Sequence, residues 1–421
     1  MTHIAYDKYK KSNSDWIGEI PSHWKINRFK IMFSYNKGNN PQTFSDESGE
    51  GLAPYLSMEY LRKDIAPTYV PITECHLKAN NGDILLLWDG SNAGEFVVSK
   101  DGLVSSTMAK LIENISIDNN FSKYLCKAIE PVLRELTIGM GVPHVSSSIL
   151  NNIQLPNIPH NEQIQIANYL NKETAKINET IDKNEKLIKL LEEKRIALIS
   201  RIVTKGLNPD TPMKDSGIEW IGEIPETSTI VPFRRICNLN QGLQYPQEKR
   251  LDAPIENSKL YITVKYLNSD EKVEEYIPNP IKRVICTEDD VLLARTGATG
   301  EVFTNLNGVF HNNFFRINYH DNINKDYLVY YLKMDAVKKI LLLKAGVTTI
   351  PDLNHGSFLE TPFILYDLDE QKEIVNYLDQ ETSKITKTIS KIKENINLLE
   401  EYKVSLIHHV VTGKVDVRCE V

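Results

Sequence analysis

The sequence repeats itself, and this repeat constrains the fold more than any other feature. The stretch EQIQIANYLNKETAKI at Glu162–Ile177 returns as EQKEIVNYLDQETSKI at Glu370–Ile385. The phrase DWIGEIP at Asp15–Pro21 likewise returns as EWIGEIP at Glu219–Pro225. Self-similarity of this kind indicates one structural unit used more than once. We therefore expect the order unit, helix, unit, helix, with an internal pseudo-two-fold repeat.

Each repeated helical segment carries a heptad pattern. Apolar residues recur every seven positions, and a second row follows four residues after the first. This pattern is typical of a left-handed coiled coil, and we expect the two helices to pair antiparallel, with Asn184 near Ile392. Asn161 and Asp369 are the expected N-caps. The predicted coiled-coil seam consists of Leu170, Ile177, Ile181, Asn184, Ile188, Leu191, Leu198, Leu378, Ile385, Ile389, Ile392, Ile396, Leu399 and Leu406.

The segments between the helices have mixed α/β patterns. GDILLLWDGSNAGEF at Gly82–Phe96 resembles DDVLLARTGATGEVF at Asp289–Phe303, and in both an apolar run precedes a glycine turn. Such a run indicates a buried strand. The predicted fold class is α+β, with two mixed α/β domains separated by two long helices that form an antiparallel coiled coil. The predicted ranges are 1–160 for the first domain, 161–206 for the first helix, 207–368 for a linker and the second domain, and 369–421 for the second helix and a tail.

Composition narrows the class of protein. The chain has 421 residues, of which 41% are apolar and 25% charged, as in globular proteins of more than one domain. Its apolar runs are too short to cross a membrane, and its first residues lack the apolar core of a secretory signal. Five scattered cysteines without a CxxC pair indicate a reducing compartment and no zinc site. We expect a cytoplasmic protein with no membrane partner.

The sequence lacks recognisable catalytic motifs. It has no GxxxxGK[ST] loop for nucleotide phosphates and no N-P-P-[FY] loop of an adenine methyltransferase. The segment PDLN at Pro351–Asn354 lacks the lysine of a nuclease core, and the neighbours His408 and His409 point to different faces of a helix. We expect no catalytic residue, no metal and no cofactor. A duplicated binding architecture remains, and duplex DNA is a ligand that suits two-fold symmetry. The net charge of −7 counts mildly against DNA.

The repeated motifs resemble those of the specificity subunit of Type I restriction–modification enzymes. The resemblance covers nearly the whole chain and rests on four features found twice in one order. They are the SDWIGEIPSHW and IEWIGEIP openings, the glycine turn before a Glu, the EQ…NYL start of each helix, and the LLEE…VT ending, which in the second copy closes with GKVDVR. Two departures are the acidic net charge and Ser228, which stands where the first copy has Trp24.

The resemblance implies a division of labour. Each unit would be a target recognition domain that reads one half of a bipartite site in double-stranded DNA. The helices would act as spacers and dock two methylation subunits, which use S-adenosylmethionine. ATP-dependent restriction and motor subunits would cleave the DNA. WIGEIP would then join each recognition domain to the helices, with Trp16 and Trp220 as buried anchors.

Base reading is expected from loops that differ between the two units, because two different half-sites need different side chains. Arg is well suited to guanine and Asn to adenine. Lone histidines such as His144 and His311 are more often structural than catalytic. The candidate DNA-binding residues are Trp88, Asp89, Ser91, Asn92, Ser105, Ser106 and His144 in the first unit, and Arg295, Thr296, Thr299, Asn312, Asn313, Thr348 and Thr349 in the second.

Two other functions stay open at this point. The chain could be a coiled-coil adaptor that joins proteins without DNA, and salt-sensitive binding to duplex DNA would separate the two. It could also be a fused methyltransferase or nuclease, which activity of the isolated chain would reveal.

Overall fold

The computed structural model describes residues 5–63, 65–137, 143–346 and 351–418. The chain folds into two compact units. The first consists of Met1–Asn184 with Lys393–Val421, and the second consists of Glu185–Ile392. Each unit therefore combines one of the predicted domains with half of each long helix. The fold class is α+β, as the sequence predicted.

Among its described residues, the first unit has two antiparallel strand pairs and two four-stranded sheets. The hairpin β1–β2 contains the WIGEIP phrase, and β3 pairs with β12. One sheet has the order β4-β11-β8-β9; the other, β6-β5-β10-β7, contains a parallel pair. The strands are β1 (Tyr9–Lys11), β2 (Glu19–Pro21), β3 (Lys25–Arg28), β4 (Phe33–Lys37), β5 (Leu52–Leu56), β6 (Tyr69–Pro71), β7 (Lys78–Ala79), β8 (Ile84–Leu87), β9 (Phe96–Val98), β10 (Gly102–Val104), β11 (Met108–Glu113) and β12 (Gln154–Asn157).

The second unit repeats this topology sheet by sheet. The pairs β13–β14 and β15–β24 correspond to β1–β2 and β3–β12, and the sheets have the orders β16-β23-β20-β21 and β18-β17-β22-β19. The apolar runs ILLL and VLLA form the fully buried strands β8 and β20, as predicted. The strands are β13 (Met213–Asp215), β14 (Glu223–Pro225), β15 (Thr229–Pro232), β16 (Cys237–Gln241), β17 (Ser258–Ile262), β18 (Tyr276–Pro278), β19 (Ile285–Cys286), β20 (Val291–Ala294), β21 (Val302–Phe303), β22 (Gly308–Phe310), β23 (Phe314–Tyr319) and β24 (Pro362–Leu365).

The shorter helices differ between the units. In the first, Asp118 caps one long helix, α3 (Asn119–Glu135), whose buried face includes Phe121, Leu125 and Ile129. In the second, the corresponding segment is divided into α7 (Lys325–Leu332) and α8 (Asp335–Ala345). The remaining short helices are α1 (Phe29–Met32), α2 (Met58–Lys63), α4 (Ser147–Asn152), α6 (Val264–Asn268) and α9 (His355–Leu359), with 3-10 turns η1 (Phe233–Arg235), η2 (Gln247–Lys249) and η3 (Lys282–Val284).

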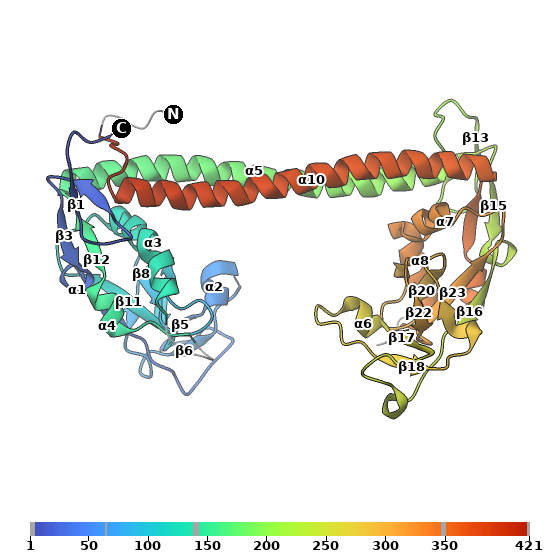
Figure 1. Ribbon diagram of the computed structural model, residues 1–421, viewed down its shortest axis with the longest axis horizontal. Helices are drawn as coiled ribbons and strands as arrows, with labels where there is room; N and C mark the ends of the chain where they lie inside the picture. Colours follow the sequence, from blue (N-terminus) through green and yellow to red (C-terminus); the bar gives the residue numbers. More distant parts are fainter. Residues whose placement is uncertain (1–4, 64, 138–142, 347–350, 419–421) are drawn as a thin grey trace. The chain divides into compact units, whose positions relative to one another are not determined.

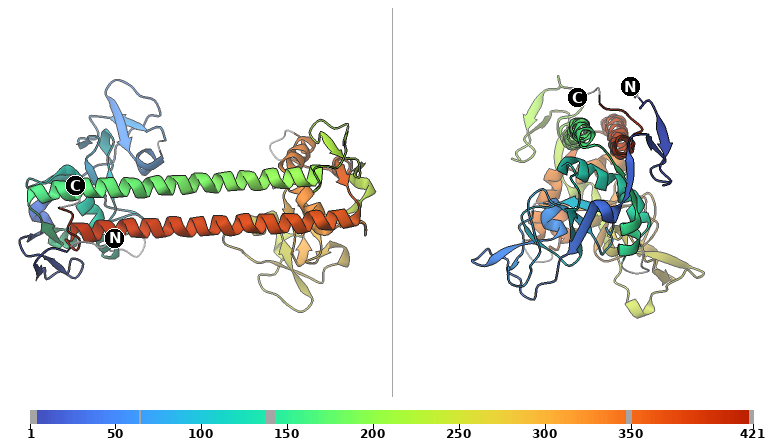
Figure 2. Two further views of the ribbon diagram at one scale, coloured as in Figure 1. Left: turned by 90° about the horizontal axis from the view of Figure 1, so that it is seen from above. Right: turned by 90° about the vertical axis from the view of Figure 1, so that its left-hand side faces the viewer.

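The long helices α5 (His160–Lys205) and α10 (Leu368–Val411) run antiparallel, as predicted (Figures 1 and 2). In the first unit, Ile177 near the start of α5 shares a core with Leu406 near the end of α10. In the second unit, Ile202 near the end of α5 shares a core with Leu378 near the start of α10. All the predicted seam residues are buried or half-buried.

The predicted N-caps were wrong. Helix α10 starts one residue before Asp369, and Asp367 is the residue whose carboxylate accepts from the backbone N–H of Glu370, at 2.8 Å. Helix α5 starts at His160, directly after a proline, so Asn161 lies inside the helix. The sequence pattern located both helices but not the residue at which each begins.

Candidate nucleic-acid interface

The WIGEIP phrase builds the same hairpin in both units. The backbone N–H of Ser12 donates to Gly18 O, and that of Ser216 donates to Gly222 O, while both glycines have φ of +68°. Trp16 and Trp220 were predicted to be buried, but both are half-buried. The indole Nε1–H of Trp16 donates to Gln154 O at 3.0 Å. His408 of α10 lies 2.8 Å from Trp16 O through its Nε2. The hairpin thus joins the sheets to the long helix and is part of the scaffold.

Three separate chain segments meet at one edge of the first unit. They are the turn after β8 (89–94), the loop after β10 (105–107) and the segment 143–145; we call them the first edge. The backbone N–H of Trp88 donates to Thr107 O at 2.7 Å, and that of Val145 donates to Trp88 O at 2.9 Å. The structure therefore brings together the candidate residues of the first unit.

The second unit builds the same edge from equivalent segments. These are the turn after β20 (295–300), the loop after β22 (311–313) and the segment 351–353; we call them the second edge. Here the backbone N–H of Arg295 donates to Asn313 O at 2.7 Å, and that of Leu353 donates to Arg295 O at 3.0 Å. Trp88 thus corresponds to Arg295, and Thr107 corresponds to Asn313. Thr348 and Thr349 lie outside the described residues.

A fourth segment that the sequence analysis missed reaches each edge. It follows β4 in the first unit and β16 in the second, where a Cβ on Gly38 or Gly242 would lie within 2.2 Å of a backbone oxygen. The segment places Asn40 Oδ1 3.4 Å from Ser106 Oγ, and Gln244 Oε1 3.3 Å from Asn312 Nδ2. Its signal in the sequence is a Gly followed by Pro-Gln, in KGNNPQ and QGLQYPQ.

A second overlooked repeat fixes this segment. The stretches YLSMEYL at Tyr55–Leu61 and YITVKYL at Tyr261–Leu267 share the first tyrosine and the final Tyr-Leu pair. The Tyr55 hydroxyl lies 3.2 Å from Asn40 Oδ1, and the Tyr261 hydroxyl donates to Leu243 O at 2.7 Å. Burial raises the pKa of both phenols, so they stay protonated hydrogen-bond donors at neutral pH.

The first edge combines one ion pair with small polar groups. Lys37 Nζ lies 2.9 Å from Asp89 Oδ2 and 5.3 Å from the centre of the Trp88 ring. Trp88 itself is buried beneath this pair, and the buried Ser105 shares a hydrogen bond with Thr107. These two candidates are poorly placed to touch a base directly. The candidates that reach the surface are Asp89, Ser91, Asn92, Ser106 and His144.

The second edge has its ion pair at a different position. Arg295 lies 2.6 Å from Asp352, a residue that the sequence analysis did not select for this role, and the Thr296 hydroxyl donates to the same carboxylate. Asn312 and Asn313 are half-exposed on the neighbouring loop. Asn312 Oδ1 is itself buried and accepts no hydrogen bond among the described residues. The exposed acceptor of this edge is the Asp352 carboxylate.

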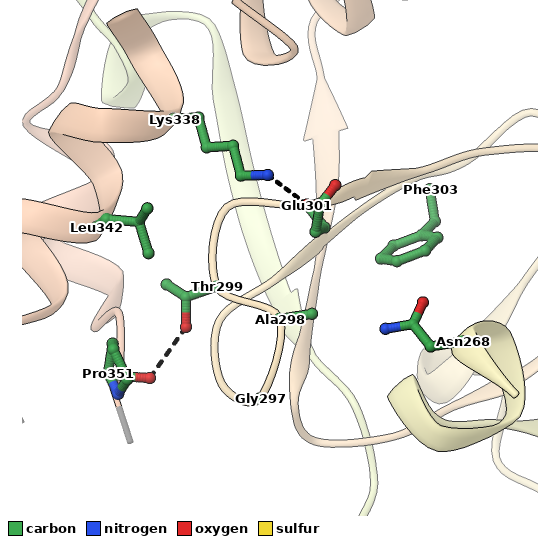
Figure 3. Close-up of a pocket in the computed structure, with 9 residues that line it drawn as sticks. All are labelled: Asn268, Gly297, Ala298, Thr299, Glu301, Phe303, Lys338, Leu342 and Pro351. Atoms are coloured by element: carbon green, nitrogen blue, oxygen red, sulfur yellow. Dashed lines mark hydrogen bonds and ion pairs between the residues drawn. The ribbon is translucent and has the colours of Figure 1, made fainter. Parts of the chain in front are cut away.

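Thr299 is part of the scaffold beneath the second edge. Its hydroxyl is buried and donates to Pro351 O at 3.0 Å, which ties the glycine turn to the segment that carries Asp352 (Figure 3). The turn borders a cavity of about 670 Å³ and is held on its other side by an ion pair between Glu301 and Lys338. In the first unit the equivalent Glu95 pairs with Arg62 of α2 instead.

His311 adds a donor of fixed orientation within the second edge. Its Nδ1 accepts from the backbone N–H of Asn313 at 3.1 Å. Burial, together with the positive charge of Arg250, lowers the pKa of His311, so the ring is neutral at neutral pH and carries its proton on Nε2. The arrangement suits hydrogen bonding rather than acid–base catalysis.

The described residues contain no cluster of three or more metal-binding side chains. Burial raises the pKa of the Cys237 thiol to about 12 and that of Cys286 to about 11, so neither is a thiolate nucleophile at neutral pH. In the part of the chain that the structure describes, no helix is both long and apolar enough to cross a membrane.

Two apolar cavities flank the WIGEIP tryptophans. One, of about 580 Å³, is lined by Trp16, by α3 and by Val404 and His408 of α10. The other, of about 420 Å³, is lined by Trp220, by α8 and by Ile196 and Ser200 of α5. Val404 and Ile196 occupy equivalent heptad positions, and about half of each side chain is exposed. Exposed apolar surface at a duplicated site is typical of a protein interface.

Two comparisons with known proteins each match most of this chain. The family model for the Type I restriction modification DNA specificity domain matches residues 21–190 and again residues 225–398. The Type I restriction enzyme MjaVIII specificity subunit of Methanocaldococcus jannaschii is 30% identical over 418 residues, which cover 95% of this chain and 94% of that one.

Solved structures share the fold. A chain from a structure of a type I R-M system, described for its complex assembly and conformational transition, has a TM-score of 0.69 at 16% identity, covering 93% of this chain and 98% of that one. The HsdS subunit from Thermoanaerobacter tengcongensis has a TM-score of 0.53 at 16% identity, covering 94% of this chain and 98% of that one.

Proposed function

This chain belongs to the Type I restriction modification DNA specificity family, and from that membership we propose that it reads a bipartite DNA site for its partner subunits. One unit recognises each half-site. The bound complex then directs adenine methylation or restriction, which the partner subunits carry out.

One observation carries this proposal, namely that a single edge architecture is built twice with different exposed side chains. The hairpins, the sheet orders and the backbone hydrogen bonds of the edges are the same in both units. The side chains at equivalent positions differ: Ser106 corresponds to Asn312, and Asp89 corresponds to Thr296. A scaffold that is kept while its surface groups change is what two different half-sites require.

The direct test is the pattern of adenine methylation in the host genome. Deleting the chain should abolish methylation at one bipartite motif, and restoring it should bring back that motif. The assembled complex should also bind a duplex containing the motif with an affinity that falls steeply with salt. Methylation that survives the deletion, or binding that needs no duplex, would favour the adaptor function instead.

We place the chemistry on the partners. The chain supplies neither methyl transfer nor cleavage; methylation subunits would use S-adenosylmethionine, and restriction and motor subunits would use ATP. The purified chain alone should transfer no methyl group to its motif, whereas the chain mixed with its methylation subunits should. Because the target is the genome of the host, we expect the complex in the cytoplasm.

The twin tryptophan cavities support docking of two methylation subunits. Each cavity lies between a recognition domain and a long helix. Two equivalent surfaces are suited to bind two copies of one partner. Val404→Glu should remove one copy and Ile196→Glu the other, since each places a charge in an apolar contact. Native mass spectrometry of the assembled complex would show the loss. Lys391→Glu, at an exposed position of α10 that lines neither cavity, is the control.

A further inference from the structure

We infer that Asp352 is a base-reading residue of the second unit and accepts a hydrogen bond from the amino group of a cytosine or an adenine. The inference deepens the proposed function and rests on it. Asp352 lies in the PDLN segment, to which no other role has been assigned, and its backbone pairs with Thr296 at the second edge.

The burial of the Arg295–Asp352 pair favours the carboxylate as the reader. Some 55% of the Asp352 side chain is exposed, against 17% of the Arg295 side chain. Arg295 also donates through Nε to Leu353 O at 3.2 Å, and its guanidinium lies 5.5 Å from the centre of the Phe315 ring. The guanidinium is thus held behind the carboxylate, and an approaching duplex meets the carboxylate first.

Arg295 also removes the electrostatic objection to a carboxylate at a DNA surface. An unpaired carboxylate would repel the phosphate backbone. Here the guanidinium neutralises the charge at 2.6 Å, and the Thr296 hydroxyl fixes the orientation of the group. Thr299 anchors the preceding Pro351 from below. Asp352 is therefore a neutralised acceptor with a defined direction.

The remaining acceptor capacity defines the ligand. A carboxylate has about four lone-pair sites, and Arg295 and Thr296 leave part of them open on the exposed side. In the major groove, amino donors are presented by cytosine N4 and adenine N6, whereas guanine presents acceptors there. Asp352 should therefore select an amino-bearing base and reject guanine. The equivalent position of the first edge is His144, so this preference belongs to the second half-site alone.

The test replaces Asp352 and leaves the scaffold in place. Asp352→Asn keeps the shape but adds a donor, and Asp352→Ala removes the acceptor. Glu360→Gln is the matched control, because Glu360 forms an exposed ion pair with Arg234 at 2.8 Å elsewhere in the same unit. Each variant would replace the chain in the host, methylated motifs would be sequenced, and unfolding temperatures would confirm that the variants fold.

With Asp352→Asn we expect one position of the second half-site to relax. Preference of the assembled complex for the amino-bearing base in duplex binding should fall on the order of tenfold or more. The first half-site should not change, and Glu360→Gln should alter neither half.

Two results would overturn the inference. An unchanged motif and preference in both Asp352 variants would leave the residue with a structural role only. Equally tighter binding to every duplex would identify the carboxylate as a repelling group. Failure of the proposed function is distinguishable, because then the wild-type chain itself would direct no bipartite methylation.

Discussion

In the first unit, the long helix that packs against the WIGEIP hairpin is followed by Gly413; in the second unit, it is followed by Gly206. A Cβ on Gly413 would lie 2.4 Å from Pro21 and 2.9 Å from the ring of Trp24. A Cβ on Gly206 would lie 3.4 Å from Pro225 and 3.9 Å from Tyr366. In both units a glycine after the long helix therefore faces the equivalent proline but a different aromatic residue, although the two glycines are offset by one residue in the repeat.

The two aromatic residues come from different places in the chain. Trp24 follows the first hairpin, and Ser228 takes its place after the second. Tyr366 precedes helix α10, at the position that Ile158 occupies before α5. Trp24 and Tyr366 are both buried, and Tyr366 donates to Val203 O at 3.2 Å. After duplication, the two copies have thus kept a large buried ring at this junction, although they supply it from different positions.

The prediction with the largest expected effect tests whether the first edge alone reads the first half-site. Replacing residues 82–145 with the same block of a relative of different specificity should replace the first half of the methylated motif completely and leave the second half intact. The reason is that the first edge receives most of its exposed groups from this block. Methylome sequencing is the measurement, and a change in both halves would contradict the independence of the two units.

The next prediction tests whether an aromatic ring supplied from the position before the long helix can replace Trp24. Trp24→Ser should destabilise the first unit by about 3–5 kcal/mol, because it removes a fully buried ring and a donor to Glu162 at 2.9 Å. Adding Ile158→Tyr should recover part of that loss by supplying the ring from the position that the second unit uses. Chemical denaturation of the single and double variants provides the measurement.

Ser228→Ala is the matched control in the second unit. Ser228 is buried and its hydroxyl donates to Pro225 O at 2.9 Å, so removing this hydroxyl should cost about 1 kcal/mol. If Trp24→Ser lowers the free energy of unfolding by no more than this control does, the buried tryptophan does not stabilise the contact between the hairpin and the long helix.

Sequence patterns predicted the elements that the spacing of apolar residues identifies, namely the long helices and the buried strands. The heptads gave both long helices to within one residue at their starts, and the apolar runs ILLL and VLLA gave the buried strands. Asp352 escaped prediction because its role depends on a partner, Arg295, more than fifty residues away in the chain. Trp88 and Ser105 were selected from loop sequences that do not reveal burial. Pairing across a sheet and side-chain direction are set by tertiary contacts, which a single sequence does not display.

The next prediction has a smaller expected effect and concerns equivalent positions of the two long helices. Asn184 of α5 and Ile392 of α10 are equivalent heptad residues, yet Asn184 Nδ2 is buried and has no hydrogen-bond partner among the residues that the structure describes. Asn184→Ile should raise the free energy of unfolding by about 1–2 kcal/mol, because an unsatisfied donor leaves the seam. Ile392→Asn should lower it by a similar amount. Thermal unfolding of both variants tests the pair, and a loss of stability with Asn184→Ile would contradict the assignment of Asn184 to the apolar seam.

The smallest expected effect concerns Glu162 and Glu370, which occupy the same position in the repeat. We expect substitution by glutamine to lower the stability at the first and to raise it at the second. Glu162 accepts from Trp24 Nε1 at 2.9 Å and lies 2.7 Å from His23 Nε2, so Glu162→Gln should destabilise the first unit. For Glu370, burial and the neighbouring Asp367 raise the pKa of the carboxyl. A raised pKa in the folded state favours folding below the unfolded pKa, and this contribution is lost as pH rises through the folded pKa. Glu370→Gln should therefore increase the unfolding temperature slightly at pH 7, and the gain should vanish as pH falls below about 4. An equal gain at both pH values would show that the ionisation of Glu370 is not its cause.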